Sequence, residues 1–380
     1  MEQLRTENSR NLGFTRSFRL QRCRRLTSLK IAQVAPLIES VPPRLYGGTE
    51  RVVSWLTEEL VAQGHDVTLF ASGDSKTTAK LHPVVPRALR LEGIRNSVPY
   101  NLIMLDQIAR RITDFDVLHF HIDFFHYPLF RNMADKIVTT LHGRQDLPEL
   151  PDIYRAFPAM PLVSISNHQR EPVPPVNWMG TVYHGLPQNL FRPGGGHGGY
   201  LAFLGRICPD KNPLDAIEIA RRAGMRLRMA AKIDPVDRDY FEQVVGPVIA
   251  RSPHVEFVGE IDDGLKQEFL GEARALLFPI RWPEPFGLVM IEAMACGTPV
   301  VAFRHGSVPE VLEDGLTGFV VESVEDAVNA LDCLGELSRT RVRARFEQRF
   351  SANAMTRAYC KIYQRLLAAP RGSMEITKVA

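Results

Sequence analysis

The stretch PIRWPEPFGLVMIEAMACG, residues 279–297, places two carboxylates on either side of a turn that is rich in backbone amides. Flanking prolines keep Glu284 out of a helix, so it is expected on a loop that follows a buried strand. A helix that resumes near Gly287 leaves its first backbone N–H groups unpaired, which suits an anion, and puts Glu292 in its second turn. This order of acid, anion site and acid predicts a site for a sugar, its diphosphate and a ribose. The amides assigned to the anion are those of Phe286, Gly287, Leu288 and Val289.

Two cations follow another predicted strand, YLAFLG, in the segment GRICPDKN. Arg206 and Lys211 stand at the carboxyl end of that strand, which is where a parallel sheet binds its ligands. When a nucleotide sugar loses its leaving group, negative charge builds up on the β-phosphate, and fixed cations stabilise that charge without donating a proton. Taken alone, the pair could equally be surface-loop residues. Together with Glu284, it predicts a diphosphate site.

The N-terminal half contains a second group of candidates at strand and helix ends. Gly47 and Gly48 precede a predicted helix and would let the backbone approach a phosphate or a sugar closely. The segments LHFHID and TLHG both end a predicted strand with histidine. Alternation puts His119 and His121 on one face, and we expect a structural role for His119 and a site role for His121 at the strand end. The candidates on the acceptor side are His119, Asp123 and His142.

Buried-looking strands alternate with helical patterns along the chain, which predicts two α/β domains, each doubly wound and Rossmann-like. The expected strands lie at 30–35, 66–72, 116–121, 137–143, 161–166, 180–185, 200–206, 227–232, 255–261, 275–280 and 299–303. Two such domains facing each other would form a ligand cleft between them. The expected segments are a disordered basic extension at 1–28, an acceptor domain at 29–192, a glycine-rich linker at 193–199, a donor domain at 200–351, and at 352–380 a helix that crosses back to the first domain, with a tail.

The composition limits the class of protein. With 380 residues, of which 45% are hydrophobic and 23% charged, the chain is long enough for two cores. A net charge of +3 gives no indication of nucleic-acid binding. The five cysteines lack disulfide or metal-ligand spacing, and no apolar run is long enough to span a bilayer, so we expect a cytoplasmic protein. The Arg-rich extension leaves open a peripheral contact with anionic lipid.

Together these residues resemble the retaining glycosyltransferases of family 4, which adopt the GT-B fold of two facing Rossmann-like domains. The resemblance covers the chain from about residue 30 to about residue 367. It is carried by the E-x7-E motif EPFGLVMIE, the GR…K pair, the GGTE segment and the HFH strand end. It implies that Glu284 contacts the donor-sugar hydroxyls, that Glu292 contacts the ribose, and that His121 lies near the reacting hydroxyl. The residues implied to hold the diphosphate are Arg206 and Lys211.

The resemblance also implies an activity, which is transfer of a hexosyl group from a UDP- or GDP-sugar to a hydroxyl acceptor with retention of the anomeric configuration. A carbohydrate, a lipid-linked molecule and a small metabolite are all compatible acceptors. Because Glu284 is assigned to sugar hydroxyls, we expect front-face transfer rather than attack by a carboxylate. We expect no metal and no cofactor, and interpret the DFD segment at 114–116 as a solvated turn. The residues expected to act in catalysis are His121, Arg206, Lys211 and Glu284.

Two other functions fit parts of this pattern. One is a nucleotide-sugar epimerase on the same GT-B architecture. The other is a non-catalytic protein that binds nucleotide sugars. The cations expected at the leaving group count against the binding protein, because binding alone does not require charge at the β-phosphate.

Overall fold

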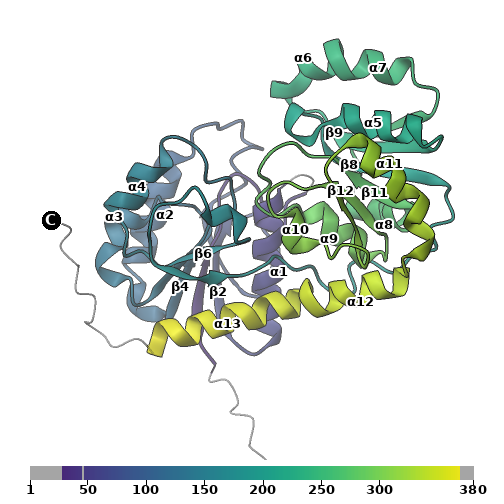
Figure 1. The fold of residues 1–380 in the computed structure, drawn as a ribbon. Helices are drawn as coiled ribbons and strands as arrows, with labels where there is room; N and C mark the ends of the chain where they lie inside the picture. Colours follow the sequence, from purple (N-terminus) through teal and green to yellow (C-terminus); the bar gives the residue numbers. More distant parts are fainter. Residues whose placement is uncertain (1–27, 45–46, 369–380) are drawn as a thin grey trace, which may run out of the picture.

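Two separate parallel sheets form the two lobes of the protein (Figure 1). The structure is a computed structural model, and it describes residues 28–44 and 47–368. Almost all of the basic extension predicted at 1–28 lies outside the described residues, as does the tail after residue 368. Within the described part of the chain, no helix combines the length and apolar character needed to cross a bilayer.

The N-terminal sheet has seven parallel strands in the order β3-β2-β1-β4-β5-β6-β7. Its central strands are buried on both faces, because helices cover the sheet on two sides. The strands are β1 (Lys30–Val34), β2 (Asp66–Ser72), β3 (Lys80–Val85), β4 (Val117–Phe120), β5 (Ile137–Thr140), β6 (Leu162–Ser164) and β7 (Trp178–Thr181). The helices are α1 (Gly48–Ala62), α2 (Val98–Ala109), α3 (Tyr127–Phe130) and α4 (Leu150–Ala156).

The C-terminal sheet has six parallel strands in the order β10-β9-β8-β11-β12-β13. They are β8 (Tyr200–Arg206), β9 (Arg226–Lys232), β10 (Val255–Gly259), β11 (Ala275–Phe278), β12 (Val300–Phe303) and β13 (Gly318–Val321). The helices are α5 (Pro213–Arg222), α6 (Arg238–Tyr240), α7 (Gly246–Ala250), α8 (Asp263–Gly271), α9 (Leu288–Ala295), α10 (Val308–Val311), α11 (Val324–Asp332), α12 (Arg339–Arg349) and α13 (Ala352–Ala368).

Both sheets reverse their strand order once, between β1 and β4 and between β8 and β11. Ligands of doubly wound sheets bind outside the carboxyl ends of the strands at such a reversal. The predicted pair of doubly wound domains is therefore confirmed. Strands β3 and β13 were not predicted from the sequence. The strand expected at 180–185 instead lies at Trp178–Thr181.

The glycine-rich segment at 193–199 forms neither helix nor strand, but it is bound to the C-terminal lobe. The Arg339 guanidinium donates hydrogen bonds to the carbonyl oxygens of Gly194 (2.9 Å), Gly271 (2.7 Å) and Ala273 (3.0 Å). A side chain on Gly194 would come within 2.3 Å of the Gly271 carbonyl oxygen. Glycine is therefore needed at position 194 for close packing of two backbones, and not only for freedom of the chain.

The last helix, α13, starts beside the C-terminal lobe and runs along the N-terminal lobe (Figure 1). It packs against α1, which explains why α1 is buried on more than its predicted apolar face. Two tyrosines of α13 reach the sheet. The Tyr359 hydroxyl lies 2.9 Å from Thr140 Oγ1, and the Tyr363 hydroxyl lies 2.8 Å from His119 Nδ1. This helix therefore ties the end of the chain to the interior of the first lobe.

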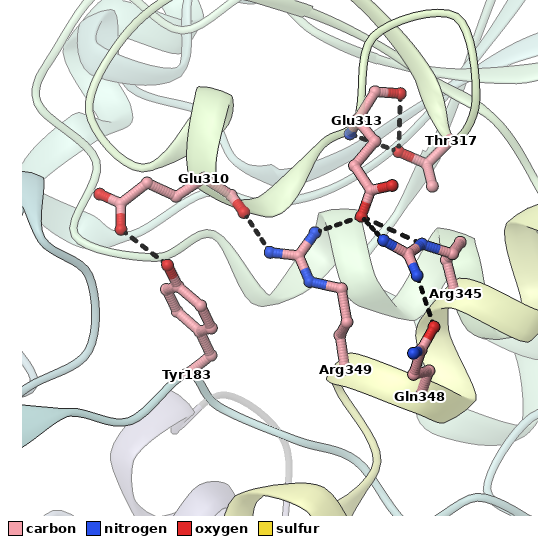
Figure 2. Close-up of polar contacts among 7 residues, drawn as sticks. All are labelled: Tyr183, Glu310, Glu313, Thr317, Arg345, Gln348 and Arg349. Carbon is pink, nitrogen blue, oxygen red and sulfur yellow. Dashed lines mark hydrogen bonds and ion pairs between the residues drawn. The ribbon is translucent and has the colours of Figure 1, made fainter.

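Glu310, in α10 of the C-terminal lobe, forms a second link between the lobes. Its carboxylate accepts hydrogen bonds from the backbone N–H groups of Asn167 (2.7 Å) and His168 (2.8 Å). It also accepts one from the Tyr183 hydroxyl at 3.0 Å (Figure 2). Burial, together with the Glu310 carboxylate, raises the pKa of Tyr183 to about 12, so this hydroxyl stays a donor. We call this set of contacts the Glu310 link.

Arginines of α12 hold α10 in place for the Glu310 link (Figure 2). Arg349 donates hydrogen bonds to the Glu310 carbonyl oxygen at 2.7 Å and to the Glu313 carboxylate at 2.8 Å. Arg345 also binds Glu313, at 3.0 Å through its Nε. Burial opposes the charge on Glu313, but the two arginines outweigh it and hold the pKa of Glu313 below its ordinary value. The Glu310 link is therefore anchored on α12, and α13 follows α12 directly in the chain.

We predict that Glu310→Ala destabilises the protein by about 1–3 kcal/mol, because it removes three hydrogen bonds to a charged acceptor across the lobes. Thermal melting should show a lower melting temperature for this variant. The control is Glu336→Ala, a change at an exposed carboxylate of the same lobe, which should melt like the parent protein. Equal melting of the two variants would show that the Glu310 link contributes nothing.

Candidate active site

A cleft of about 540 Å³ lies between the two lobes, at the carboxyl ends of their strands. Residues of both lobes line it. The residues predicted from sequence to bind the donor all line this one cleft: Gly47, Gly48, Arg206, Lys211, Glu284, Phe286, Gly287, Leu288, Val289 and Glu292. Residues that are up to 245 positions apart in the chain therefore line one cleft. They do so because each sheet faces the cleft at the point where its strand order reverses.

Glu284 lies in a turn that the loop after β12 holds in place. The Ser307 N–H donates to the Glu284 carbonyl oxygen at 2.9 Å, and Ser307 Oγ donates to the Phe286 carbonyl oxygen at 2.8 Å. Gly306 has a φ of 55°, and a side chain on it would come within 2.4 Å of the Glu284 backbone nitrogen. The Trp282 indole N–H donates to Glu284 Oε2 at 3.0 Å. Both the backbone and the carboxylate of Glu284 are therefore fixed before any ligand binds.

Helix α9 begins at Leu288, directly after this turn. Gly287 precedes it with a φ of 76°, a conformation that favours glycine. The N-terminus of α1 lies across the cleft, so close that a side chain on Gly48 would come within 3.6 Å of Leu288 Cδ1. The starts of both helices therefore lie at the same part of the cleft, where helix N-termini favour an anion.

Lys211 ends a short 3₁₀ helix, Pro209–Lys211, and its ammonium forms an ion pair with the Glu284 carboxylate. The Lys211 Nζ also lies 5.1 Å from the ring centroid of Trp282 and 5.5 Å from that of Phe278. The sequence assigned Lys211 to the diphosphate and Glu284 to the sugar, and the structure shows that the two side chains are neighbours. A ligand that binds both must therefore lie across this ion pair.

Glu292 has a partner that the sequence did not indicate. Lys266 of α8 places its Nζ 2.8 Å from Glu292 Oε1 and 3.3 Å from Asp263 Oδ1. Burial disfavours the charge on Lys266, but Glu292 and Asp263 outweigh burial and hold the pKa of Lys266 above its ordinary value. In the sequence, Lys266 looks like an ordinary polar position of an amphipathic helix, and only the fold brings it to Glu292, 26 residues later.

Arg206 is the last residue of β8 and lies among acidic side chains. Its Nη1 is 3.5 Å from Asp234 Oδ2, and its Nε is 3.2 Å from Asp237 Oδ2. Lys232, at the end of β9, places its Nζ 2.9 Å from Asp234 Oδ1. Burial of Asp234 is outweighed by Lys232 and Arg206, which hold its pKa below the ordinary value. Arg206 is therefore charged and held in place where it lines the cleft.

Of the three histidines predicted from the sequence, His119 and His121 do not line the cleft. His119 is fully buried and bonded to Thr140 Oγ1 (2.7 Å) and the Tyr363 hydroxyl (2.8 Å), so it contributes to the interior of the lobe and does not line the cleft. His121 is also absent from the cleft lining, but its Nδ1 lies 2.8 Å from His142 Nε2. Asp123 is exposed and lies outside the lining.

Two histidines do line the cleft, His142 and His184. Their rings stack with centroids 5.2 Å apart, and His184 packs edge-on against Phe286 of the other lobe. Burial lowers the pKa of His142 to about 3 and that of His184 well below its ordinary value, so both rings are neutral near pH 7. Their buried Nδ1 atoms have no hydrogen-bond partner among the described residues. No role was predicted for His184 from the sequence, although it follows a strand as His142 does.

Across residues 28–44 and 47–368, no group of three or more His, Cys, Asp or Glu side chains is arranged to hold a metal ion. In the DFD segment, Asp114 pairs with Arg111 at 3.0 Å, and Asp116 accepts a hydrogen bond from the Lys30 N–H at 2.8 Å. These two aspartates therefore serve the local structure at the start of β4.

Glu50, in the first turn of α1, is a buried carboxylate in the lining of the cleft. It is only 7% exposed, and burial, with a smaller contribution from Glu39, raises its pKa to about 7. A carboxyl group that titrates near neutral pH inside a cleft is typical of functional sites. Glu50 lies within the GGTE segment, and no role was predicted for it from the sequence.

Two facing Rossmann-like lobes with a shared cleft define the GT-B class of glycosyltransferases, and comparison with family models supports this class. Residues 196–354 match the model of glycosyl transferases group 1, and residues 46–170 match that of glycosyltransferase family 4. Each match falls on one lobe, and together they cover most of the described chain. The chain belongs to the family 4 glycosyltransferases.

Two relatives illustrate this membership. A phosphatidyl-myo-inositol mannosyltransferase of Propionibacterium freudenreichii is 29% identical over 340 residues, which cover 78% of this chain and 84% of the relative. A 41.2 kDa protein in the cps region of Klebsiella pneumoniae is 32% identical over 171 residues, which cover 43% of this chain and 46% of the relative. The chain therefore aligns with less than half of the second relative.

A solved structure supports the fold. The Anabaena protein HepE in complex with UDP-glucose aligns with a TM-score of 0.65 and 16% sequence identity, covering 89% of this chain and 99% of HepE. At this level of identity, the likeness shows that the two proteins share the arrangement of two lobes.

We predict that Glu50→Gln stabilises the protein at pH 8. The pKa of this carboxyl is about 7 in the folded protein and near 4.5 in the unfolded chain, so ionised Glu50 destabilises the fold above pH 7. This penalty should fade as the pH drops from about 7 to about 4.5. We expect the variant to be more stable by about 1–3 kcal/mol at pH 8 and equal to the parent at pH 4.5 in denaturant titrations. An equal difference at both pH values would contradict this account.

Proposed function

We propose that this glycosyltransferase moves a hexosyl group from a nucleotide-diphosphate sugar to a hydroxyl acceptor and retains the anomeric configuration. One observation carries the proposal. The Glu284–Lys211 pair, the start of α9 and Arg206 line a single cleft, so a sugar, a diphosphate and a leaving-group charge can be bound together. This arrangement supports the roles that the family resemblance implies for the same residues.

We propose a binding place for each part of the donor from the charges that line the cleft. The sugar hydroxyls bind Glu284, and the diphosphate binds Arg206, Lys211 and the backbone N–H groups that begin α9. The ribose binds Glu292, whose carboxylate is held by Lys266. Gly47 and Gly48 bring the backbone of the other lobe close to the phosphate, because neither has a side chain in the way.

The proposed reaction takes place on one face of the sugar. As the bond between the anomeric carbon and the β-phosphate oxygen breaks, the acceptor oxygen bonds the same carbon, and its proton passes to the departing phosphate oxygen. Glu284 already binds Trp282 and Lys211, which suits recognition of hydroxyls better than nucleophilic attack. The cations and the α9 N-terminus stabilise the negative charge where it develops.

Among the histidines, we propose that His142 contacts the substrate, because it lines the cleft and its buried Nδ1 lacks a partner among the described residues. His121, expected from sequence near the reacting hydroxyl, is then a positioning residue. Its Nε2 lies 2.8 Å from Gln33 Oε1, and its Nδ1 faces His142 Nε2. The amide oxygen accepts a hydrogen bond from His121 Nε2–H, so His121 Nδ1 accepts one from His142 Nε2–H, and His142 Nδ1 is left without a proton as an acceptor for the substrate.

The donor base and the acceptor class are further parts of the proposal. We favour a UDP- or GDP-sugar, and the likeness to HepE, which was solved with UDP-glucose, supports the first. A carbohydrate, a lipid-linked molecule or a small metabolite can supply the hydroxyl. One relative is a phosphatidyl-myo-inositol mannosyltransferase, so a lipid-linked acceptor at the inner face of a membrane should be tested. In that case, the basic residues before the first strand would make the peripheral contact with the membrane.

Thermal shift with a panel of nucleotide sugars identifies the donor, and nucleotide release with and without acceptor then tests the function. A transferase releases nucleotide in proportion to added acceptor, a binding protein releases none, and an epimerase converts the donor without release. NMR of the product anomeric proton shows whether the configuration is retained.

We predict that Glu284→Gln and Lys211→Ala each lower kcat/KM for transfer at least about 100-fold, or roughly 3 kcal/mol, because each removes one member of the central ion pair. The control is Lys80→Ala, which breaks a surface ion pair with Asp66 away from the cleft and should leave transfer unchanged. Parent-like turnover in either cleft variant would exclude these roles.

We also predict that transfer needs no metal ion. Arg206, Lys211 and the start of α9 supply the positive charge that a metal would otherwise bring to the diphosphate. Nucleotide release in excess EDTA should stay within about twofold of the untreated rate. A loss of activity that added Mg²⁺ or Mn²⁺ restores would show that a metal takes part.

A further inference from the structure

A second cavity, of about 230 Å³, adjoins the donor cleft. The turn that carries Glu284 separates the two. Glu284 lines the donor cleft, Pro283 lines the second cavity, and Pro285 lines both. The opposite wall belongs to the N-terminal lobe and contains Arg144 and Glu171 among other polar residues. The second cavity is therefore another interlobe space, with an apolar wall on one side and a polar wall on the other.

A segment of the N-terminal lobe also passes from one space to the other. His142 lines the donor cleft, and Arg144 and Asp146, a few residues later, line the second cavity. The Gln169 amide holds this segment by donating hydrogen bonds to the carbonyl oxygens of Leu141 (2.9 Å) and Gly143 (2.8 Å). The segment and the proline turn thus bring Glu284 and His142 to the boundary between the two spaces. A molecule that extends from the second cavity past Pro285 would reach Glu284 and His142, which line the donor cleft.

The segment is also tied to the opposite lobe. The Arg144 guanidinium carbon lies 5.5 Å from the ring centroid of Trp282, whose indole binds Glu284. The second cavity and the carboxylate assigned to the donor sugar therefore share one tryptophan. Occupancy of the cavity can influence the position of Glu284 through this contact.

The charges of the second cavity disfavour one class of ligand, which is an anionic one. Arg144 binds Asp146 through two hydrogen bonds of 2.7 Å each, which raise the pKa of Arg144 and lower that of Asp146, so both are charged at neutral pH. Glu171, 3.7 Å from His168, is a second carboxylate. The lining therefore holds one guanidinium and two carboxylates. This excess of negative charge disfavours a phosphorylated or carboxylated ligand.

We propose that the second cavity is the acceptor subsite and that it takes a neutral glycosyl unit rather than a phosphorylated one. Its carboxylates can accept hydrogen bonds from sugar hydroxyls, and its guanidinium can donate them. The two prolines offer an apolar wall for the ring carbons. The inference rests on the proposed transferase function, since it names the acceptor class for the same reaction.

Ligand-observed NMR with saturation transfer tests the subsite without turnover. The probes are the methyl α-glycosides of glucose, galactose and mannose, together with the 6-phosphates of these sugars, added to the full chain with UDP or GDP present. We expect at least one neutral glycoside to bind and the phosphates to give no signal. Asp146→Asn should weaken glycoside binding at least about tenfold, because it removes the charge that pairs with Arg144.

The matched control is Asp152→Asn. Asp152 forms a similar pair with Arg155 at 2.7 Å in the same lobe, but it is exposed and lies outside the cavity. This variant should bind the glycosides like the parent. The proposal is overturned if no glycoside binds, if the phosphates bind as well as the glycosides, or if Asp146→Asn and Asp152→Asn behave alike. Failure of the transferase function would look different, because glycosides would bind without any nucleotide release from a nucleotide sugar.

Discussion

Two parallel sheets can share a ligand cleft only if their carboxyl edges are held face to face. In this protein, α13 and the Glu310 link provide that constraint, the first by packing along the N-terminal lobe and the second by joining α10 to the backbone at Asn167 and His168. Both converge on α12, whose arginines bind Glu310 and Glu313. The active-site residues depend on this constraint because they come from both lobes, and a change in the angle between the lobes would separate them.

Within the cleft, charge is balanced before any ligand binds. Lys211 pairs with Glu284, Lys266 with Glu292, and Arg206 with two aspartates. A nucleotide sugar would bring a diphosphate for the cations and hydroxyls for the carboxylates, so binding exchanges partners and does not bury unpaired charge. In the proposed reaction, negative charge develops on the leaving phosphate beside Arg206, Lys211 and the start of α9, and catalysis requires stabilisation of the transition state at that point. The same pairs hold these side chains in position in the cleft.

The sequence predicted the parts that depend on local patterns. The buried runs of both sheets, the turn at Glu284 and the start of α9 beside Gly287 all follow from residues next to one another. Strand β3 escaped notice because it lies at the sheet edge, is largely exposed and contains Pro83. Lys266 and His184 also escaped notice, because their roles depend on partners that only the fold brings near. The glycine-rich segment was predicted as a linker without regular structure, but its binding by Arg339, which lies far along the chain, depends on the fold and could not be predicted.

The central claim is that a diphosphate binds between the start of α9 and the two cations, Arg206 and Lys211. A crystal structure of the protein with the nucleotide sugar that it binds most tightly tests this claim directly. We expect the diphosphate oxygens within hydrogen-bond distance of the backbone N–H groups at Gly287–Val289, and the Lys211 ammonium turned from Glu284 toward phosphate. A diphosphate bound elsewhere, with the Lys211–Glu284 pair intact and the cleft empty, would contradict the account.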